Sequence, residues 1–325
     1  MRLLLPASYF LLPNPIGGRV DVGLIGLGRM GANMAERLAA AGHRVVGYDV
    51  DAATRDRLAA AGRETAASLE ALVAALSPPR CVWVMVPAGD ATSATIDALV
   101  PFLRPGDLVV DGGNSFYKDS VARGVALAAR GLAFVDVGVS GGIWGLAEGY
   151  SVMAGGDADA YARVLPLLQS LAPAPDRGLA HVGPTGAGHF VKMIHNGIEY
   201  GMMQALAEGF AILDAKREFD LDLGDVAEVW RHGSVVRSWL LDLAAAVLRR
   251  DGDLSDLRAW VSDSGEGRWT VAEAIELDIP APVITLALQQ RLRSRQSDPF
   301  AERLLAALRR EFGGHAVQAA EESPS

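Results

Sequence analysis

Residues 20–35 read VDVGLIGLGRMGANMA, and this stretch decides the fold. Its apolar segment over residues 22–25 is typical of a buried strand. Gly26, Gly28 and Gly31 follow in G-x-G-x-x-G spacing, and an alanine-rich helical pattern begins within the same motif. A strand, a glycine turn and a helix in this order predict the first unit of a doubly wound, Rossmann-like α/β sheet.

Each glycine of this motif has its own physical reason. Gly26 makes the tight turn, Gly28 lets a pyrophosphate approach the backbone, and Gly31 allows the helix to pack closely on the strand. The first turn of the helix offers free N–H groups to the phosphates. A second strand, HRVVGYDV, leads to Asp49, about 20 residues after the loop, where a carboxylate accepts hydrogen bonds from a ribose diol. The pattern therefore predicts a dinucleotide cofactor.

Asp49 also predicts which dinucleotide is preferred. Its carboxylate would repel a 2′-phosphate, and no arginine follows it directly. Arg55 is the nearby residue that could offset this repulsion, so we expect NAD rather than NADP. The remaining residues expected at the cofactor are Leu27, Arg29, Met30, Val86 and Asn114.

Four further apolar segments continue the alternation of strands and helices. They are CVWVMVP (81–87), DLVVDGGNS (107–115), AFVDVGVSGG (133–142) and SVMAGG (151–156), with a helix through Leu103 after the first. Ligands bind at the carboxyl ends of parallel strands, so Asn114 is expected at the cofactor and the substrate. The same holds for the next loop, which contains Ser140, Gly141 and Gly142. Ordinary turns rich in Gly and Asn are the alternative interpretation.

Beyond Gly183 the pattern becomes helical and rich in Trp and Leu. The sequence therefore predicts an α/β Rossmann-like N-terminal domain over residues 20–182, followed by an all-α C-terminal domain over residues 183–317. Residues 1–19 and 318–325 are expected to be a disordered extension and a disordered tail. The apolar start of this extension is too short to span a bilayer and is interrupted by prolines.

A long proline-free run over Ala187–Ala215 predicts a central helix. Lys192, Asn196 and Glu199 stand at i, i+4 and i+7, so they share one face of that helix. A base, an amide and an acid on one face suit proton transfer around a bound hydroxyl group. A buried helix whose polar face is only solvated is the alternative interpretation. The residues that flank this face are His195 and Tyr200.

Composition limits the function classes. Half of the 325 residues are hydrophobic and 21% are charged, which is typical of a folded chain with more than one domain. The net charge of −9 argues against nucleic-acid binding, because no basic stripe is available to neutralise phosphates. The histidines and Cys81 have no zinc-ligand spacing, so no metal is predicted. A single cysteine excludes a disulfide framework and fits a small buried side chain in a reducing cytoplasm.

Four segments connect the chain to a known family. They are GLIGLGRMGANMAERL (23–38), VDGGNSFYKDS (110–120), DVGVSGGIWGLAEGYSVMAGG (136–156) and GAGHFVKMIHNGIEYGMMQ (186–204). On these segments the chain resembles 6-phosphogluconate dehydrogenase (decarboxylating), within the β-hydroxyacid dehydrogenase superfamily, over residues 20–317. HNGIEYG (195–201) and RREFGGH (309–315) narrow the resemblance to the phosphogluconate branch. The length is similar to that of the short bacterial type, which includes NAD-preferring members.

The resemblance implies oxidative decarboxylation of 6-phospho-D-gluconate to D-ribulose 5-phosphate, a step of the pentose phosphate pathway. Lys192 would take the proton of the substrate 3-hydroxyl, which a lysine can do where burial or a neighbouring charge lowers its pKa. Glu199 would protonate the enediol left after loss of carbon dioxide. The β-keto group is itself the electron sink, so no metal is implied. The residues that would hold the hydroxyls and the carboxylate are Asn114, Ser140, Gly141, Gly142, His195 and Asn196.

The resemblance also implies a phosphate site and an oligomer. Arg309 and His315 are expected from the tail of a partner subunit, which implies a homodimer or a homotetramer. One departure leaves part of this site open, because Ser264 and Glu266 stand where the family has lysine and threonine. The residues that match the family's phosphate-binding positions are Tyr200, Arg291, Arg309 and His315.

Two other functions remain compatible with the glycine motif. A β-hydroxyacid dehydrogenase for a small non-phosphorylated acid, such as 3-hydroxyisobutyrate, would keep Lys192 but lack Glu199 and the phosphate residues. A non-catalytic NAD-binding sensor would be expected to have lost Lys192, Asn196 or Glu199, and all three are present.

Overall fold

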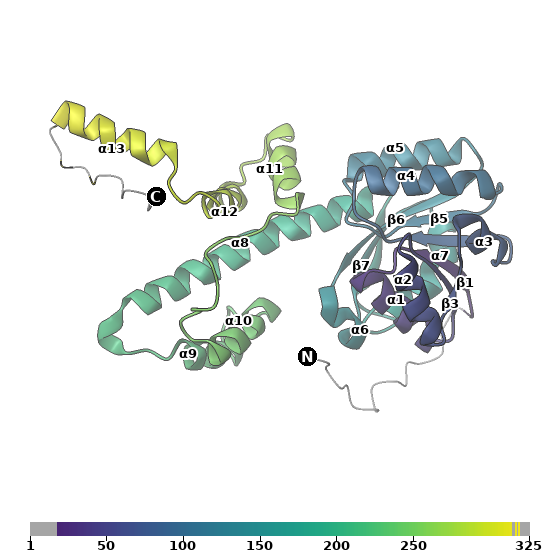
Figure 1. The fold of residues 1–325 in the computed structure, drawn as a ribbon, viewed down its shortest axis with the longest axis horizontal. Coiled ribbons are helices and arrows are strands. Elements are labelled where there is room, and N and C mark those ends of the chain that lie inside the picture. The colour runs from purple at the N-terminus through teal and green to yellow at the C-terminus, as the bar shows by residue number, and fades with distance from the viewer. Residues whose placement is uncertain (1–17, 314–315, 317, 319–325) are drawn as a thin grey trace. The chain divides into compact units, whose positions relative to one another are not determined.

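The computed structural model describes residues 18–313, 316 and 318, and eight strands form one sheet (Figure 1). The strands are β1 (Asp21–Ile25), β2 (Arg44–Tyr48), β3 (Glu64–Thr65), β4 (Cys81–Val84), β5 (Leu108–Asp111), β6 (Ala133–Ser140), β7 (Ser151–Gly156) and β8 (Leu179–Gly183). Their order is β3-β2-β1-β4-β5-β6-β7-β8. Neighbouring strands run parallel, except that β6 and β7 run antiparallel.

Helices cover both faces of this sheet. One face carries α1 (Arg29–Ala40) and α7 (Ala158–Leu171), and the other carries α3 (Leu69–Ala74), α4 (Asp90–Leu99) and α5 (Tyr117–Ala128). Each face of the sheet has its own hydrophobic core, and alternate residues of β4 contribute to the two. Trp83 packs in the core beside α1 and α7, and Val82 and Val84 pack in the core beside α3, α4 and α5. Strands that are covered on both faces are apolar throughout, as CVWV in β4 shows. This doubly wound arrangement confirms the predicted Rossmann-like fold.

The strand order places the glycine loop at the point where the sheet changes direction. From β1 the chain builds outward to β3, and it then crosses back to β4 on the other side of β1. The loops that follow β1 and β4 therefore lie next to each other at the carboxyl ends of two central strands. Open α/β sheets bind their ligands in the crevice at this switch point.

The long helix is α8 (Ala187–Ala215), and its limits confirm the prediction. The chain divides into two compact units, Met1–Asn196 and Gly197–Ser325, which we call the sheet unit and the helical unit. The first ten residues of α8 belong to the sheet unit, and the rest of α8 belongs to the helical unit. The domain limits 20–182 and 183–317 stay a prediction.

The helical unit contains two small cores. In one, Phe210 of α8 packs with Ala227 and Leu241, and in the other Tyr200 of α8 packs with Ala287 and Leu288. Side chains start two of its helices, since Asp222 accepts the N–H of Asp225 at 2.9 Å and Ser238 accepts that of Leu241 at 3.2 Å. Besides α8, the helices are α9 (Leu223–Arg231), α10 (Trp239–Arg250), α11 (Glu266–Glu276), α12 (Pro282–Arg293) and α13 (Phe300–Gly313).

A few elements differ from the sequence prediction. β3 and β8 were not predicted, and the helix expected through Leu103 ends at Leu99, followed by the 3-10 turn η2 (Val100–Phe102). Pro101 explains this end, because proline has no N–H to donate and its ring clashes with the carbonyl four residues earlier in an α-helix. The remaining short elements are α2 (Ala52–Ala60), η3 (Gly142–Trp144), α6 (Gly145–Glu148) and η4 (Arg217–Phe219).

Cys81 has the role that was predicted for it. It is buried in β4, where burial raises the pKa of its thiol to about 12. Within residues 18–313 no helix is both long and apolar enough to cross a membrane. The predicted disordered extension lies, up to residue 17, outside the described residues, as does most of the predicted tail.

Candidate active site and cofactor crevice

The glycine loop has the geometry that a dinucleotide site needs. Gly26 has a φ of 91°, and a Cβ added to it would lie 2.3 Å from the Met85 carbonyl oxygen of the neighbouring loop. A Cβ on Gly31 would lie 1.9 Å from the Gly26 oxygen, so the start of α1 touches the turn. A Cβ on Gly28 would meet no atom within 4 Å. The backbone beside Gly28 is therefore accessible at the N-terminus of α1, which fits a pyrophosphate.

Asp49 lies against this loop. Its carboxylate accepts the N–H of Leu27 at 2.7 Å with one oxygen and that of Asp51 at 2.9 Å with the other. The Arg55 guanidinium donates to the main-chain oxygen of Asp49 at 2.6 Å, and no bond from it to the Asp49 carboxylate is seen in the described chain. The Asp49 carboxylate is therefore held beside the glycine loop, at the position where the predicted preference for NAD needs it.

A buried ion pair joins the loops after β4 and β5, which carry Val86 and Asn114. Arg123 contacts the Asp111 carboxylate at 3.1 Å and donates to the Gly89 oxygen at 3.3 Å. The Asn114 side chain is exposed next to these anchored groups. Of the other predicted cofactor residues, Arg29 is exposed and Met30 is half-buried in the first turn of α1. Sequence reasoning missed this pair, because Asp111 and Arg123 show their relation only in the folded chain.

Four predicted residues meet between β6 and the sheet-unit part of α8. Lys192, which is 8% exposed, donates from Nζ to Asn196 Oδ1. His195 Nδ1 lies 3.1 Å from the same oxygen, and its Nε2 lies 3.4 Å from Ser140 Oγ. An amide oxygen only accepts, so His195 donates from Nδ1 in its contact with Asn196.

Glycines let the strand and the helix approach each other here. A Cβ on Gly138 would lie 2.4 Å from Lys192 Cβ, so only glycine fits between β6 and the lysine. After Ser140, Gly141 and Gly142 have φ values of 133° and 52°, in the region that favours glycine. The loop therefore turns sharply at the end of β6, directly after the serine that meets His195.

An acid that was not predicted fixes the start of α8. Asp136 of β6 is fully buried and accepts the N–H of Gly186 at 2.6 Å and that of His189 at 2.8 Å. Burial raises the pKa of Asp136, although His189 and the two N–H bonds act in the opposite direction. Ser120 of α5 joins the cluster through His189 Nδ1 at 2.7 Å. Asp136 stands four residues before Ser140 on the same face of β6, and this spacing was the available sign that both side chains face the same helix.

The helical unit brings two of the predicted phosphate residues together. The Arg291 guanidinium lies 3.5 Å from the centroid of the Tyr200 ring and donates to the Ser262 oxygen at 2.9 Å. Glu199 is half-buried one residue before Tyr200 on α8. Arg309 is exposed on α13, and His315 lies outside the described residues.

The two positions that depart from the family pattern lie at the start of α11. Glu266 is 1% exposed in its first turn, and its carboxylate oxygens have no hydrogen-bond partner within the described part of the chain. The Tyr200 hydroxyl is also buried without such a partner there. Ser264 precedes the Gly265 cap of this helix.

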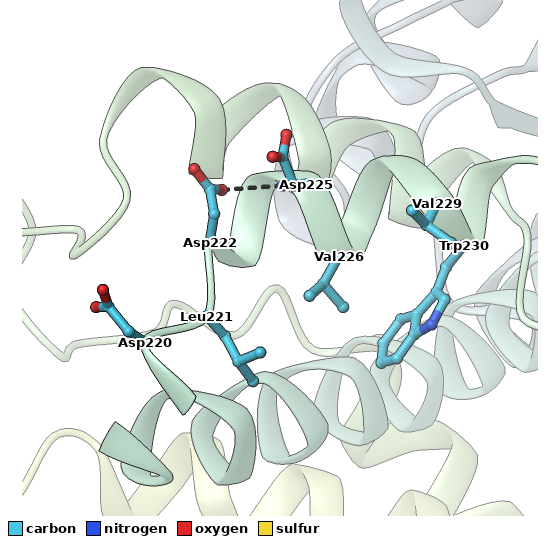
Figure 2. Close-up of a pocket in the computed structure, with 7 residues that line it drawn as sticks. All are labelled: Asp220, Leu221, Asp222, Asp225, Val226, Val229 and Trp230. Atoms are coloured by element: carbon cyan, nitrogen blue, oxygen red, sulfur yellow. Dashed lines mark hydrogen bonds between the residues drawn. The ribbon is translucent and has the colours of Figure 1, made fainter. Parts of the chain in front are cut away.

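A separate hollow of about 400 Å³ in the helical unit contains none of the predicted site residues. Figure 2 shows its apolar floor, with Trp230 and Val226, and acidic groups that include Asp222, bonded to the N–H of Asp225. Among the described residues no group of three or more His, Cys, Asp or Glu side chains could hold a metal ion.

Comparison with known protein families agrees with the geometry of both units. Residues 21–183 match the NAD binding domain of 6-phosphogluconate dehydrogenase, and residues 188–323 match the C-terminal domain of 6-phosphogluconate dehydrogenase. Together the two matches span most of the chain.

Individual relatives give the same result. A Haloferax volcanii protein named NAD(+)-dependent, decarboxylating 6-phosphogluconate dehydrogenase is 46% identical over 299 residues, which are 92% of this chain and 98% of that protein. A decarboxylating 6-phosphogluconate dehydrogenase of Bacillus licheniformis is 37% identical, over 89% of this chain and 65% of its own length. The solved 6-phosphogluconate dehydrogenase of Plasmodium falciparum superposes with a TM-score of 0.78 at 28% identity, covering 94% of this chain and 67% of its own.

Proposed function

Because the chain belongs to the 6-phosphogluconate dehydrogenase family, we propose that it oxidises and decarboxylates 6-phospho-D-gluconate to D-ribulose 5-phosphate and carbon dioxide, with reduction of NAD. The observation that carries the proposal is the cluster of Lys192, Asn196, His195 and Ser140 between β6 and α8. It places a buried amine, an amide, an imidazole and a hydroxyl at the carboxyl end of a strand, where Rossmann-like sheets bind their substrates.

The cofactor residues support NAD. Gly28 leaves the backbone open to a pyrophosphate, and Asp49 presents a carboxylate at the neighbouring strand end. This carboxylate accepts from a ribose diol and repels a 2′-phosphate. Leu27, Arg29, Met30, Gly26 and Gly31 form the loop and the first helical turn around the same position, and Val86 and Asn114 come from the adjacent loops.

The side chains of α8 divide the proton transfers between them. When bound, the nicotinamide supplies the hydride acceptor. Asn196 Oδ1 orients Lys192 Nζ, and Lys192 accepts the proton of the substrate 3-hydroxyl. The protonated lysine then polarises the resulting ketone, which takes up the electrons of the breaking C–C bond as carbon dioxide leaves. Glu199 donates a proton to the enediol, and Ser140, Gly141, Gly142 and His195 hold the hydroxyls and the carboxylate.

The phosphate end depends on the helical unit and on a second copy of the chain. Tyr200 and Arg291 contact each other, and we assign them to the phosphate together with Arg309 and His315 of a neighbouring subunit. α13 supports assembly into a homodimer or a homotetramer, because its apolar residues are exposed. These residues are Phe300, Leu304, Leu305 and Leu308.

We place the reaction in the cytoplasm, where NAD is available and where the one cysteine stays reduced. Two alternatives are less well supported by particular residues. A dehydrogenase for a small non-phosphorylated acid has no use for Arg291 stacked on Tyr200. A non-catalytic NAD sensor has no use for a buried lysine held by Asn196.

One assay separates these functions. Purified protein is given 6-phosphogluconate, gluconate or 3-hydroxyisobutyrate with NAD or NADP, and formation of reduced cofactor and of carbon dioxide is measured. We expect both products from 6-phosphogluconate with NAD, and neither from the Lys192→Met variant. Turnover of 3-hydroxyisobutyrate without carbon dioxide would favour the first alternative, and NAD binding without turnover of any substrate would favour the second.

A further inference from the structure

β6 and α8 form a ladder of three contacts along their shared face. Asp136 accepts two N–H groups at the start of α8, Gly138 faces Lys192, and Ser140 reaches His195. Successive residues of a strand point to opposite faces, so positions 136, 138 and 140 all face the helix. Their partners on α8 advance by three residues at a time, at 189, 192 and 195, which is one side of an α-helix.

Of these three contacts, only the one at Asp136 consists of fully buried hydrogen bonds. The Asp136 carboxylate receives the Gly186 N–H at 2.6 Å and the His189 N–H at 2.8 Å, and hydrogen bonds to a charged acceptor are stronger than neutral ones. Gly186 directly precedes α8 and His189 lies in its first turn, where the N–H groups have no helical carbonyl to receive them. At the other end of the ladder, Ser140 Oγ lies 3.4 Å from His195 Nε2, and both residues are half-buried.

The backbone around Asp136 leaves no slack for a shifted helix. A Cβ on Gly188 would lie 2.5 Å from the Asp136 main-chain oxygen, and a Cβ on Gly155 would lie 2.7 Å from its carboxylate. The helix therefore starts in direct contact with β6 and β7, and the two amide bonds select one position along the strand. Because α8 is a continuous helix, the positions of the residues that follow His189 along β6 depend on where the helix begins.

We propose that Asp136 is a positioning residue that sets the register of α8 along β6 and so holds Lys192 opposite the Ser140 loop. The proposal rests on the assignment of Lys192 as the base that takes the 3-hydroxyl proton. A carboxylate is the side chain that fits, because it offers an acceptor oxygen to each of the two amides. Asparagine has the same shape but offers one acceptor oxygen, and its NH2 group would face an N–H donor.

The test compares Asp136→Asn with Ser120→Ala in the full-length protein. The first variant loses one of the two helix-start bonds, while the second removes a bond of the same buried cluster and leaves both amide bonds of Asp136 intact. Measured quantities are kcat, the Kd for NAD, Tm, and hydrogen–deuterium exchange of the amides of residues 186–192. A loss of stability alone would lower Tm in both variants without separating them in kcat.

For Asp136→Asn we expect kcat to fall by about 10²-fold, the loss typical of a displacement near 1 Å at a reacting group, with the Kd for NAD unchanged. Exchange should become faster at residues 186–192, and Ser120→Ala should keep the wild-type kcat. A wild-type kcat for Asp136→Asn, or an equal loss of kcat in both variants, would overturn the proposal.

Two further outcomes are covered by the same design. If Asp136→Asn does not fold, Gly138→Ala tests the register directly, because its new methyl group displaces Lys192 while Asp136 stays intact. Wild-type kcat in that variant would refute a required register. If the wild-type protein does not turn over 6-phosphogluconate, the proposed function fails but the anchor is still tested. Unchanged exchange at residues 186–192 in Asp136→Asn would then refute it.

Discussion

The sheet unit and the helical unit hold their parts of the predicted site in different ways. In the sheet unit, Asp49 is bonded to the glycine loop, and Lys192 is bonded to Asn196 beside β6. In the helical unit, Arg291 contacts Tyr200, but Arg309 is exposed on α13, whose described side chains belong to neither core of that unit. The predicted groups of the sheet unit are thus fixed by bonds within one chain, whereas we propose that Arg309 acts in a neighbouring subunit.

The two units also differ in how far the leucines of their helices are buried. Leu167, Leu168 and Leu171 of α7 are all 0% exposed, because they pack on the sheet. The leucines of α13 remain between 45% and 60% exposed. Fully burying a leucine contributes about 1.5–3 kcal/mol, so a helix with such a face gains stability from a partner. Variants in each unit distinguish a sheet unit that holds its part of the site within one chain from a helical unit that needs a second subunit.

The largest effect is expected in the sheet unit. Lys192→Met keeps an unbranched side chain at the buried position but removes the base, and general-base loss costs about 10² to 10⁴ in rate. We expect kcat to fall by at least this factor while the Kd for NAD stays the same, because the lysine is assigned to the substrate. Lys216→Met, an exposed lysine of the helical unit, is the matched control. Turnover close to wild type for Lys192→Met would remove the assignment.

Residues with a special local role were the ones that the sequence revealed. Gly26 and Gly31 announce a turn and a close packing through their spacing, and the structure gives each a contact that a Cβ would break. The α8 helix was predictable to its limits because helical spacing runs unbroken across it. Lys192 and Asn196 then followed from an i, i+4 relation within one helix, which any sequence displays.

Asp136 shows why the rest was not predictable. Its partners lie 50 and 53 residues further along the chain, so nothing in its neighbourhood announces them. The same is true of Arg37, whose guanidinium donates to the Ala172 oxygen 135 residues away. β8 was missed for a different reason, since LAHVG is a short edge strand with exposed residues and no clear alternation. Long-range bonds and edge strands depend on what the fold brings near.

A second prediction tests cofactor choice within the sheet unit. Asp49→Asn still accepts the Leu27 N–H but removes the charge that repels a 2′-phosphate. We expect the ratio of kcat/KM for NAD over NADP to fall by about 100-fold, the size of a lost paired polar interaction. Asp51→Asn removes a nearby carboxylate that caps α2 and should leave the ratio unchanged. An unaltered ratio in Asp49→Asn would show that another group selects the cofactor.

A third prediction addresses the helical unit. Arg309→Ala should raise KM for 6-phosphogluconate by about 10- to 100-fold, since a hydrogen bond to a charged group contributes roughly 1.5–3 kcal/mol. KM for NAD should not change. Arg310→Ala removes the next residue of α13, which pairs with Glu311, and should have little effect on either constant. Equal effects of the two variants would mean that α13 contributes only general charge.

A mixed dimer shows which chain provides Arg309. One subunit carries Lys192→Met and the other carries Arg309→Ala, and activity is measured at low 6-phosphogluconate. If the arginine acts in the neighbouring subunit, the site that retains Lys192 is served by the intact Arg309 of its partner, and about half of the wild-type activity remains. If each site uses its own α13, one site lacks its base and the other its arginine, and activity nearly vanishes.

The smallest expected effect is on the pH dependence of Tm, and it is tested with one histidine from each unit. His43 accepts the Val20 N–H at Nδ1 and lies 2.8 Å from Ser170 Oγ at Nε2, so its neutral form fits the folded sheet unit. Burial lowers the pKa of His43 below its ordinary value of 6.5, although a hydrogen bond to the backbone oxygen of Pro166 opposes this. Between the lowered pKa and 6.5 the unfolded chain binds more protons than the folded one, so stability falls as pH decreases through that window.

We expect the Tm of the sheet unit to drop on acidification below 6.5 and this slope to weaken in His43→Asn. His232, exposed directly after α9 in the helical unit, gives the control variant His232→Asn, which should keep the wild-type slope. A wild-type slope in His43→Asn would assign the acid sensitivity to other groups and leave the buried contacts of His43 without a role in it.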